Sequence, residues 1–177
     1  MKPEPAMICF ALAIVFAAAA VDVRSRRIPN AITYTSALVP FAFRAIRGDF
    51  DLLLPTLAGL LLGLGLLFVP WMIGGMGAGD VKLMGAVGSA LGPSVVWNVF
   101  LYSLIAGGLV ALVSLALRGD LVRGIKNTGS LILRLKNRVV PSGSEAPQKR
   151  FEPVGRIPFG VAIAIGTVSA LFPMIRA

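Results

Sequence analysis

The chain of 177 residues contains no histidine and a single cysteine, Cys9. Histidine is the usual base beside a serine or cysteine nucleophile and a common zinc ligand. Its absence therefore excludes Ser-His and Cys-His hydrolases and the histidine-based zinc proteases. A single cysteine also excludes an intrachain disulfide framework and a cysteine-rich zinc site. Few hydrolytic mechanisms remain after these exclusions.

Charge is scarce as well. Only 14% of the residues are charged, 56% are hydrophobic, and the mean hydropathy is +0.85. Soluble proteins carry about 25% charged residues, and a soluble protein of this size cannot bury so much apolar surface. The composition therefore predicts an all-α polytopic membrane protein.

The transmembrane helices are predicted from uncharged stretches, because a charge at the bilayer centre costs several kcal/mol. Four such stretches are plain: residues 5–21, 28–43, 52–79 and 157–175. A fifth, 83–117, is too long for one ordinary span, and Gly92-Pro93 in its middle is a strong helix breaker. Two helices there give about six transmembrane helices, in a single membrane domain over residues 1–177.

The basic residues predict the orientation. With six spans, 13 of the 17 lysines and arginines lie on one side of the membrane, in loops 22–30, 72–82 and 118–156. The positive-inside rule makes that side cytoplasmic and puts both termini outside. The basic charge is thereby assigned to topology and to contact with anionic membrane lipid, and no nucleic-acid binding is needed to explain it.

Two segments allow further interpretation. Within the basic loop, residues 120–140 alternate apolar and basic side chains, which is typical of a helix on the membrane surface, and residues 141–150 resemble a flexible linker. The first apolar stretch ends in Ala17–Ala20, which resembles a signal-peptide cleavage site. The basic region expected before such a site is weak, because Lys2 is accompanied by Glu4.

Asp22 and Asp80 stand apart from the other six acidic residues, which lie in tails, linkers or a loop. Each directly adjoins an apolar helix at its predicted cytoplasmic end, where an ionisable residue is a functional candidate. Two carboxyl groups that share one proton can hydrolyse a peptide without a metal or cofactor, and no cofactor is indicated here. The alternative is a non-enzymatic membrane subunit or small transporter, in which the two aspartates form a proton or cation site.

The surroundings of Asp80 suggest how a substrate is held. Four glycines occur in residues 74–79, directly before Asp80, and such a loop can grip an extended chain. The alternative is a tight turn with Asp80 as the N-cap of the next helix. Lys82 is too close in sequence to face Asp80 on a helix, so its ammonium group either reaches lipid headgroups or contacts the substrate.

Helix ends give two further predictions. Asn30, after Pro29, has the residue type and position of an N-cap for the second span. Asp80 begins a helix, whereas Asp22 lies near the end of one. Because the helix macrodipole stabilises an anion at the N-terminus, the sequence predicts Asp80 as the base and Asp22 as the acid.

Three motifs resemble those of the type IV prepilin peptidases. Residues 77–83 (GAGDVKL) match the GxGD-x-K-L motif, and Asp22 with residues 28–30 (IPN) matches the first aspartate motif. Residues 157–160 (IPFG) resemble the start of the last span in that family. The resemblance implies a polytopic intramembrane aspartyl protease. Its implied catalytic residues are Asp22 and Asp80, and the motif residues implied to bind substrate are Gly77, Gly79 and Lys82.

The resemblance also implies a substrate and a location. Such peptidases remove the short basic leader of prepilins and pseudopilins, after a glycine and before a hydrophobic segment. They act at the cytoplasmic face of the bacterial inner membrane during pilus biogenesis. Long members also N-methylate the new pilin end and carry paired cysteines. Here Cys9 is alone and within a span, so the chain is similar to the short peptidases of Flp/Tad-type pili, and we expect no methylation.

Overall fold

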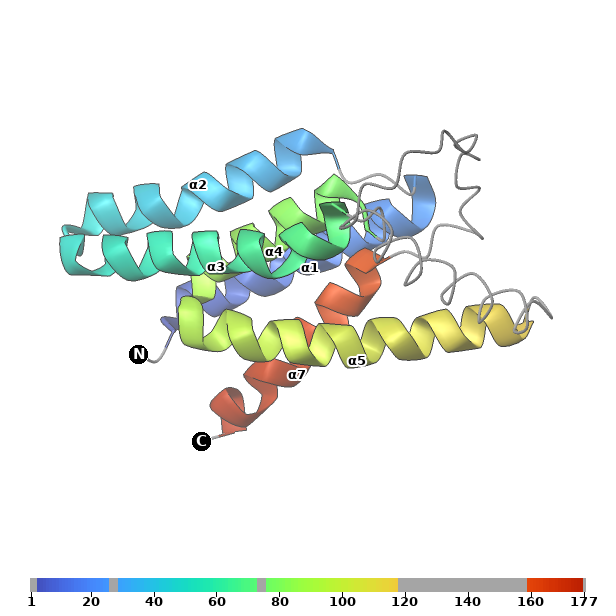
Figure 1. Cartoon of the computed structure of the whole chain (residues 1–177). Coiled ribbons are helices and arrows are strands. Elements are labelled where there is room, and N and C mark those ends of the chain that lie inside the picture. Colours follow the sequence, from blue (N-terminus) through green and yellow to red (C-terminus); the bar gives the residue numbers. More distant parts are fainter. Residues whose placement is uncertain (1–2, 26–28, 73–75, 118–158, 177) are drawn as a thin grey trace, which may run out of the picture. The chain divides into compact units, whose positions relative to one another are not determined.

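The computed structural model describes residues 3–25, 29–72, 76–117 and 159–176 (Figure 1). Over these ranges it contains six α-helices, one short 3-10 helix and no strand, which confirms the predicted all-α class. The elements are α1 (Pro5–Ser25), α2 (Asn30–Arg47), η1 (Phe50–Leu52), α3 (Leu53–Met72), α4 (Ala78–Leu91), α5 (Pro93–Leu117) and α7 (Phe159–Arg176).

The chain divides into two compact units. The first comprises Met1–Gly108 with Pro158–Ala177, and the second comprises Leu109–Ile157. Of the second unit, only the last residues of α5 are among those described. The predicted surface helix within residues 120–140 and the predicted linker at 141–150 lie outside the described residues. The features that follow belong to the first unit.

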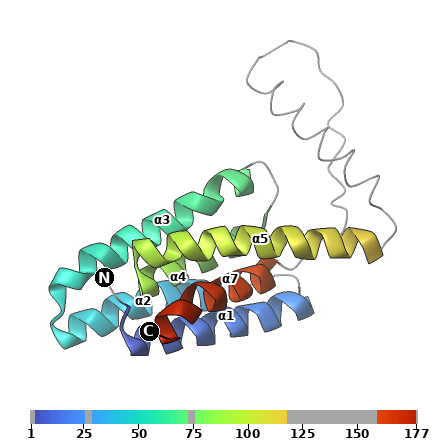
Figure 2. The ribbon, with the colours of Figure 1, turned by 90° about the horizontal axis from the view of Figure 1, so that it is seen from below.

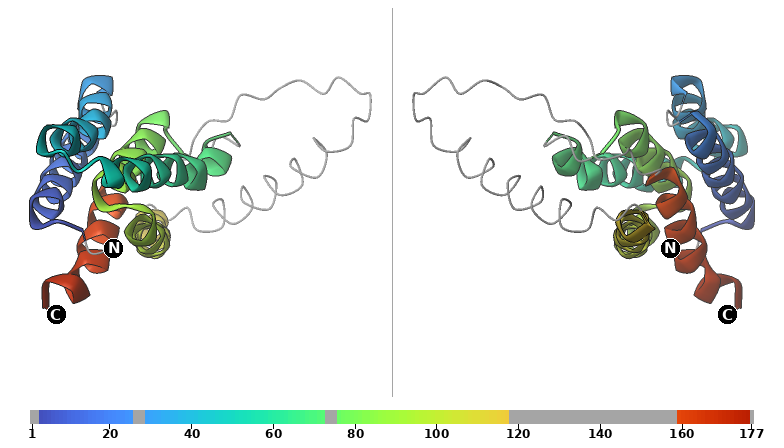
Figure 3. Two further views of the ribbon diagram at one scale, coloured as in Figure 1. Left: turned by 90° about the vertical axis from the view of Figure 1, so that its left-hand side faces the viewer. Right: turned by 90° about the vertical axis from the view of Figure 1, so that its right-hand side faces the viewer.

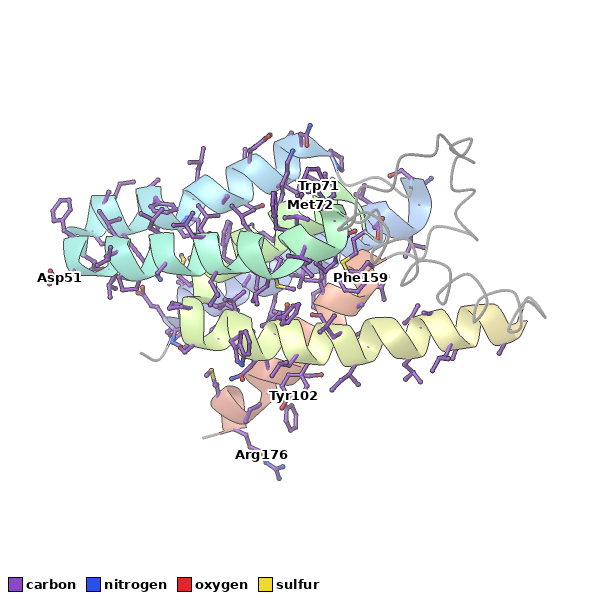
Figure 4. All side chains as sticks on the ribbon, viewed as in Figure 1. Asp51, Trp71, Met72, Tyr102, Phe159 and Arg176 are labelled. Carbon is purple, nitrogen blue, oxygen red and sulfur yellow. The ribbon has the colours of Figure 1, made fainter. Side chains whose placement is uncertain are left out.

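Successive helices of this unit alternate in direction: α1, α3 and α5 run one way, and α2, α4 and α7 run the other (Figure 1, Figure 2). The last turn of α1 and the first turns of α2, α4 and α7 therefore lie at one end of the unit, which we call the carboxylate end. Trp71 and Met72 lie at this end, whereas Asp51 lies at the opposite end (Figure 4). This alternation is what a bundle of consecutive membrane crossings requires.

Among the described residues, three helices are long and apolar enough to cross a membrane, by their length and composition. They are Pro5–Ser25, Phe50–Met72 and Pro93–Val113. Phe159–Met174 is apolar but shorter. Helix α4 has only 14 residues, or about 21 Å at 1.5 Å per residue, against roughly 30 Å of hydrocarbon. The protein is thus a membrane protein, and the count of six spans stays a prediction.

Helix α4 is the central helix of the unit. Its residues from Leu83 to Leu91 are all buried, and α1, α2, α3 and α7 all contact it; the two end views in Figure 3 show it among the other helices. Because protein surrounds α4, its length does not have to match the bilayer. It begins at Ala78 rather than near Leu83, whereas α3 ends at Met72, where the predicted loop 72–82 begins.

Glycines allow α3 and α4 to approach each other closely. Gly59 and Gly63 lie one turn apart on α3 and are buried. A Cβ atom on Gly59 would overlap the carbonyl group of Gly88, and one on Gly63 would overlap that of Met84. Small residues four apart are typical of tightly packed membrane helices, since packing rather than the hydrophobic effect holds such helices together.

Arg44 is an arginine buried inside the unit, with 2% of its surface exposed. Its guanidinium donates hydrogen bonds to the carbonyl oxygens of Leu52, at 3.2 Å, and Ala90, at 3.3 Å. Ala90 lies in the last turn of α4, where carbonyl groups lack helical partners. The uncharged stretch that predicts the second span ends before Arg44, whereas α2 continues to Arg47 and places this charge inside the unit.

Candidate active site

The structure brings Asp22 and Asp80 to the same end of the unit. Asp22 lies in the last turns of α1 and Asp80 in the first turn of α4. Both are buried, with 7% and 8% of their surfaces exposed. Helices α1 and α4 are in contact, and the two carboxyl groups are close enough to interact electrostatically. The two acids that the sequence singled out therefore lie together, at one candidate site.

Asp80 is held by the turn that begins its own helix. The N–H of Gly77 donates to Asp80 Oδ2 at 3.2 Å. Gly77 is the N-cap of α4, and Asp80, three residues on, closes the turn as the acid of a capping box does. The alternative prediction, that Asp80 is itself the N-cap, is therefore wrong. The carboxylate faces the positive end of the α4 dipole.

Gly77 and Gly79 are the two glycines before Asp80 that lie within the described residues. Gly77 has a φ of −79°, which any residue can adopt, and Gly79 lies inside α4. In the described part of the chain, positive φ angles occur at Gly48 and Gly92. A Cβ atom on Gly77 would lie 3.2 Å from Asp80 Oδ2. Gly77 thus provides space beside the carboxylate rather than an unusual backbone conformation.

Asp22 is held by the first turn of α7. The N–H of Gly160 donates to Asp22 Oδ2 at 2.9 Å. A Cβ atom on Gly160 would lie 3.0 Å from that same oxygen and 3.2 Å from the Asp22 Cβ, so glycine allows the helix to reach the carboxylate. Phe159, beside Gly160, is labelled in Figure 4 at the start of α7. The sequence analysis identified Gly160 only as part of a motif and did not predict its contact with Asp22.

Both carboxylates therefore face the N-terminus of a helix. Asp80 faces that of its own α4, and Asp22 faces that of α7. The predicted division into base and acid assumed that only Asp80 has this advantage. Because Asp22 also faces a helix N-terminus, that of α7, the helix dipoles do not determine which aspartate is the base and which is the acid.

Lys82 joins α4 to α2, two residues after Asp80 in α4. Its Nζ atom donates to Asn30 Oδ1 at 2.8 Å and lies 4.6 Å from the centre of the Tyr34 ring. The prediction that Asn30 caps its own helix is wrong, because α2 begins at Asn30, its N-cap is Pro29, and no side chain caps it. The Asn30 amide instead links two helices. The Lys82 ammonium group thus makes two contacts with α2, a hydrogen bond to Asn30 and a cation–π contact with Tyr34.

The arrangement is suited to proton transfer to and from a peptide. Two buried carboxyl groups that interact electrostatically can share one proton, which leaves one as a base and the other as an acid. Within the described ranges, no three residues among Cys, Asp and Glu gather in a way that could hold a metal ion.

Comparison with known families agrees with this geometry. The sequence profile of the type IV leader peptidase family matches residues 9–112, more than half of the chain. The chain belongs to this family. The resemblance inferred from the motifs is thereby confirmed, and membership implies a peptidase, a hydrolase embedded in a membrane. The matched residues include both aspartates but end before α7, so Gly160 lies outside the match. No curated protein and no solved structure matches the chain.

Proposed function

We propose that this leader peptidase is an intramembrane aspartyl endopeptidase that removes the short basic leader from Flp-type prepilins and pseudopilins. The observation that carries the proposal is the meeting of Asp22 and Asp80, buried at one end of the helical unit, each accepting one backbone N–H. The direct test is to incubate the detergent-solubilised protein with an Flp-type prepilin and look for the shortened product. A membrane subunit or transporter that uses the aspartates as an ion site would give none.

The proposed reaction needs one ionised and one protonated carboxyl group. The ionised group takes a proton from a water molecule as the water oxygen attacks the scissile carbonyl carbon. The protonated group gives its proton to the carbonyl oxygen. As the tetrahedral intermediate collapses, the C–N bond breaks and the amine leaves with a proton from the pair. The N–H groups of Gly77 and Gly160 hold the carboxyl oxygens in place throughout.

The proposed location is the inner membrane of a bacterial cell, in a multi-pass arrangement with the carboxylate end at the cytoplasm. We expect a single cysteine at Ser142 to be labelled from the cytoplasmic side and one at Asp49 from the opposite side, in a Cys9→Ser background that has no other cysteine. The basic loop supports this expectation through the positive-inside rule. Labelling of both positions from one side would contradict the topology.

Gly160→Ala tests the contact between α7 and Asp22. The added Cβ has to displace the carboxylate or the helix, because Asp22 Oδ2 would lie only 3.0 Å away. A small misplacement of a catalytic group is costly, so we expect kcat to fall by about tenfold or more, with normal membrane insertion. Gly108→Ala is the control, since nothing lies within 4 Å of its Cβ position. Equal activity of the two variants would remove Gly160 from the site.

Lys82 is proposed to bind the substrate. Its contacts with α2 suggest the alternative role of positioning α4 against α2. Lys82→Met removes both the hydrogen bond to Asn30 and the contact with Tyr34. If Lys82 binds substrate, KM rises in this variant but not in Asn30→Ala. If Lys82 only positions α4 against α2, both variants lower kcat alike. We expect the first pattern, and the pair of measurements separates the two roles.

A further inference from the structure

We propose that a groove between α1 and α7 binds the apolar helical segment that follows the scissile bond of the substrate. This inference rests on the proposed function and adds a binding surface to it. The groove has a volume of about 380 Å³ and is lined by Phe16, Ala19, Val161, Ala164, Ile165, Val168 and Ser169.

The groove begins close to Asp22 in the sequence of both helices that line it. On α1, Ala19 is one turn before Asp22. On α7, Val161 follows Gly160, whose N–H holds Asp22. Because α1 and α7 are in contact and run in opposite directions, the groove extends from the carboxylate end toward the membrane interior. From Val161 to Val168 it covers about 10 Å, or two turns of a helix.

The lining indicates what binds there. None of its residues is charged, and the only polar side chain is that of Ser169. A basic leader would lose its hydration in such a groove without gaining a partner, whereas an apolar segment would not. Ala19 and Ala164 are small, and small side chains let another helix approach closely in a membrane. Ile165 and Val168 are 46% and 39% exposed, so both are available to a bound helix.

Position and chemistry together favour the substrate over a lipid chain as the occupant. A substrate cut at Asp22 and Asp80 has to continue away from them, and the groove is an apolar path that begins one turn from Asp22, at Ala19. A segment seated there would place the preceding peptide bond beside the carboxyl pair and the charged leader beyond it, at the carboxylate end. A lipid chain would require no such continuity.

Filling the groove should weaken substrate binding without changing the chemistry. We expect Ile165→Trp and Val168→Trp each to raise KM for a full-length prepilin by about tenfold, which is 1.4 kcal/mol, with kcat nearly unchanged. The matched control is Ile105→Trp on α5, an exposed isoleucine outside the groove. An unchanged KM in both groove variants, with an active wild-type protein, would overturn the proposal.

Photocrosslinking identifies the occupant directly. A photoreactive residue at Ile165 is expected to crosslink to the apolar segment of the prepilin, and the same residue at Ile105 is not. Adducts to lipid alone at Ile165, or equal prepilin yields from both positions, would contradict the proposal. Failure of the proposed function is distinguishable, because the wild-type protein would then cleave no prepilin in the parallel assay.

Discussion

Asp22→Asn and Asp80→Asn are each expected to reduce prepilin cleavage by about 10²- to 10⁴-fold, the contribution of a positioned acid or base. An amide can neither take a proton from water nor give one to the carbonyl oxygen, so either substitution removes half of the proton-transfer pair. Asparagine keeps the size of the side chain and an oxygen that can accept the N–H of Gly77 or Gly160. The folded unit and its membrane insertion should therefore remain.

The matched control for these variants is Asp51→Asn. Asp51 is an exposed aspartate at the opposite end of the unit (Figure 4), and its replacement should leave the cleavage rate unchanged. Turnover is measured with purified protein and prepilin, and insertion by membrane fractionation. A chelator should not affect the wild-type rate. Near-normal turnover by either Asp22→Asn or Asp80→Asn would refute the assignment of the catalytic pair.

Gly63→Ala and Gly65→Ala are expected to change stability in different ways, although they lie two residues apart on α3. At Gly63 the new methyl group would overlap the carbonyl of Met84, and at Gly65 nothing lies within 4 Å. Overpacking of this kind costs about 1–3 kcal/mol, whereas alanine at an open helical position is neutral or favourable by about 0.5–1 kcal/mol. We expect thermal unfolding in detergent to show a loss for Gly63→Ala alone.

A second buried glycine provides an independent check on this contact. Gly59→Ala should also destabilise the protein, because its Cβ would overlap the Gly88 carbonyl. Both obstacles are backbone atoms, which cannot rotate away as a flexible side chain can. If Gly63→Ala and Gly59→Ala unfolded at the same temperature as Gly65→Ala, the close packing of α3 against α4 would be disproved.

The class of the protein and its paired acids were predictable from the sequence for a simple reason. A charge is expensive inside a bilayer, so an apolar chain with few charges reveals both its helices and its exceptional residues. Asp22 and Asp80 stood out because they adjoin apolar helices. The structure brings them together because α1 and α4 run in opposite directions, so that the last turn of one meets the first turn of the other.

The helix boundaries and polar contacts were less predictable, since the same residue type can serve a local or a distant partner. Asn30 has the residue type of an N-cap, yet its amide binds Lys82, 52 residues away. Arg44 resembles the end of a span, yet its guanidinium satisfies carbonyl groups of η1 and α4. In both cases the sequence pattern suggested a local role, whereas the side chain contacts a residue from another part of the chain.

The sequence by itself determined that this is an all-α membrane protein of the leader peptidase family, and it singled out Asp22 and Asp80 as the candidate acids. Those conclusions follow from composition and from motifs local in the chain. Only the tertiary structure decided that Gly160, 138 residues from Asp22, supplies the N–H that holds it, and that α4 is a buried central helix. The Gly160–Asp22 contact and the burial of α4 both depend on which helix surfaces pack together. That packing is decided by how well two helices fit each other, which the pattern of residues along one helix does not reveal.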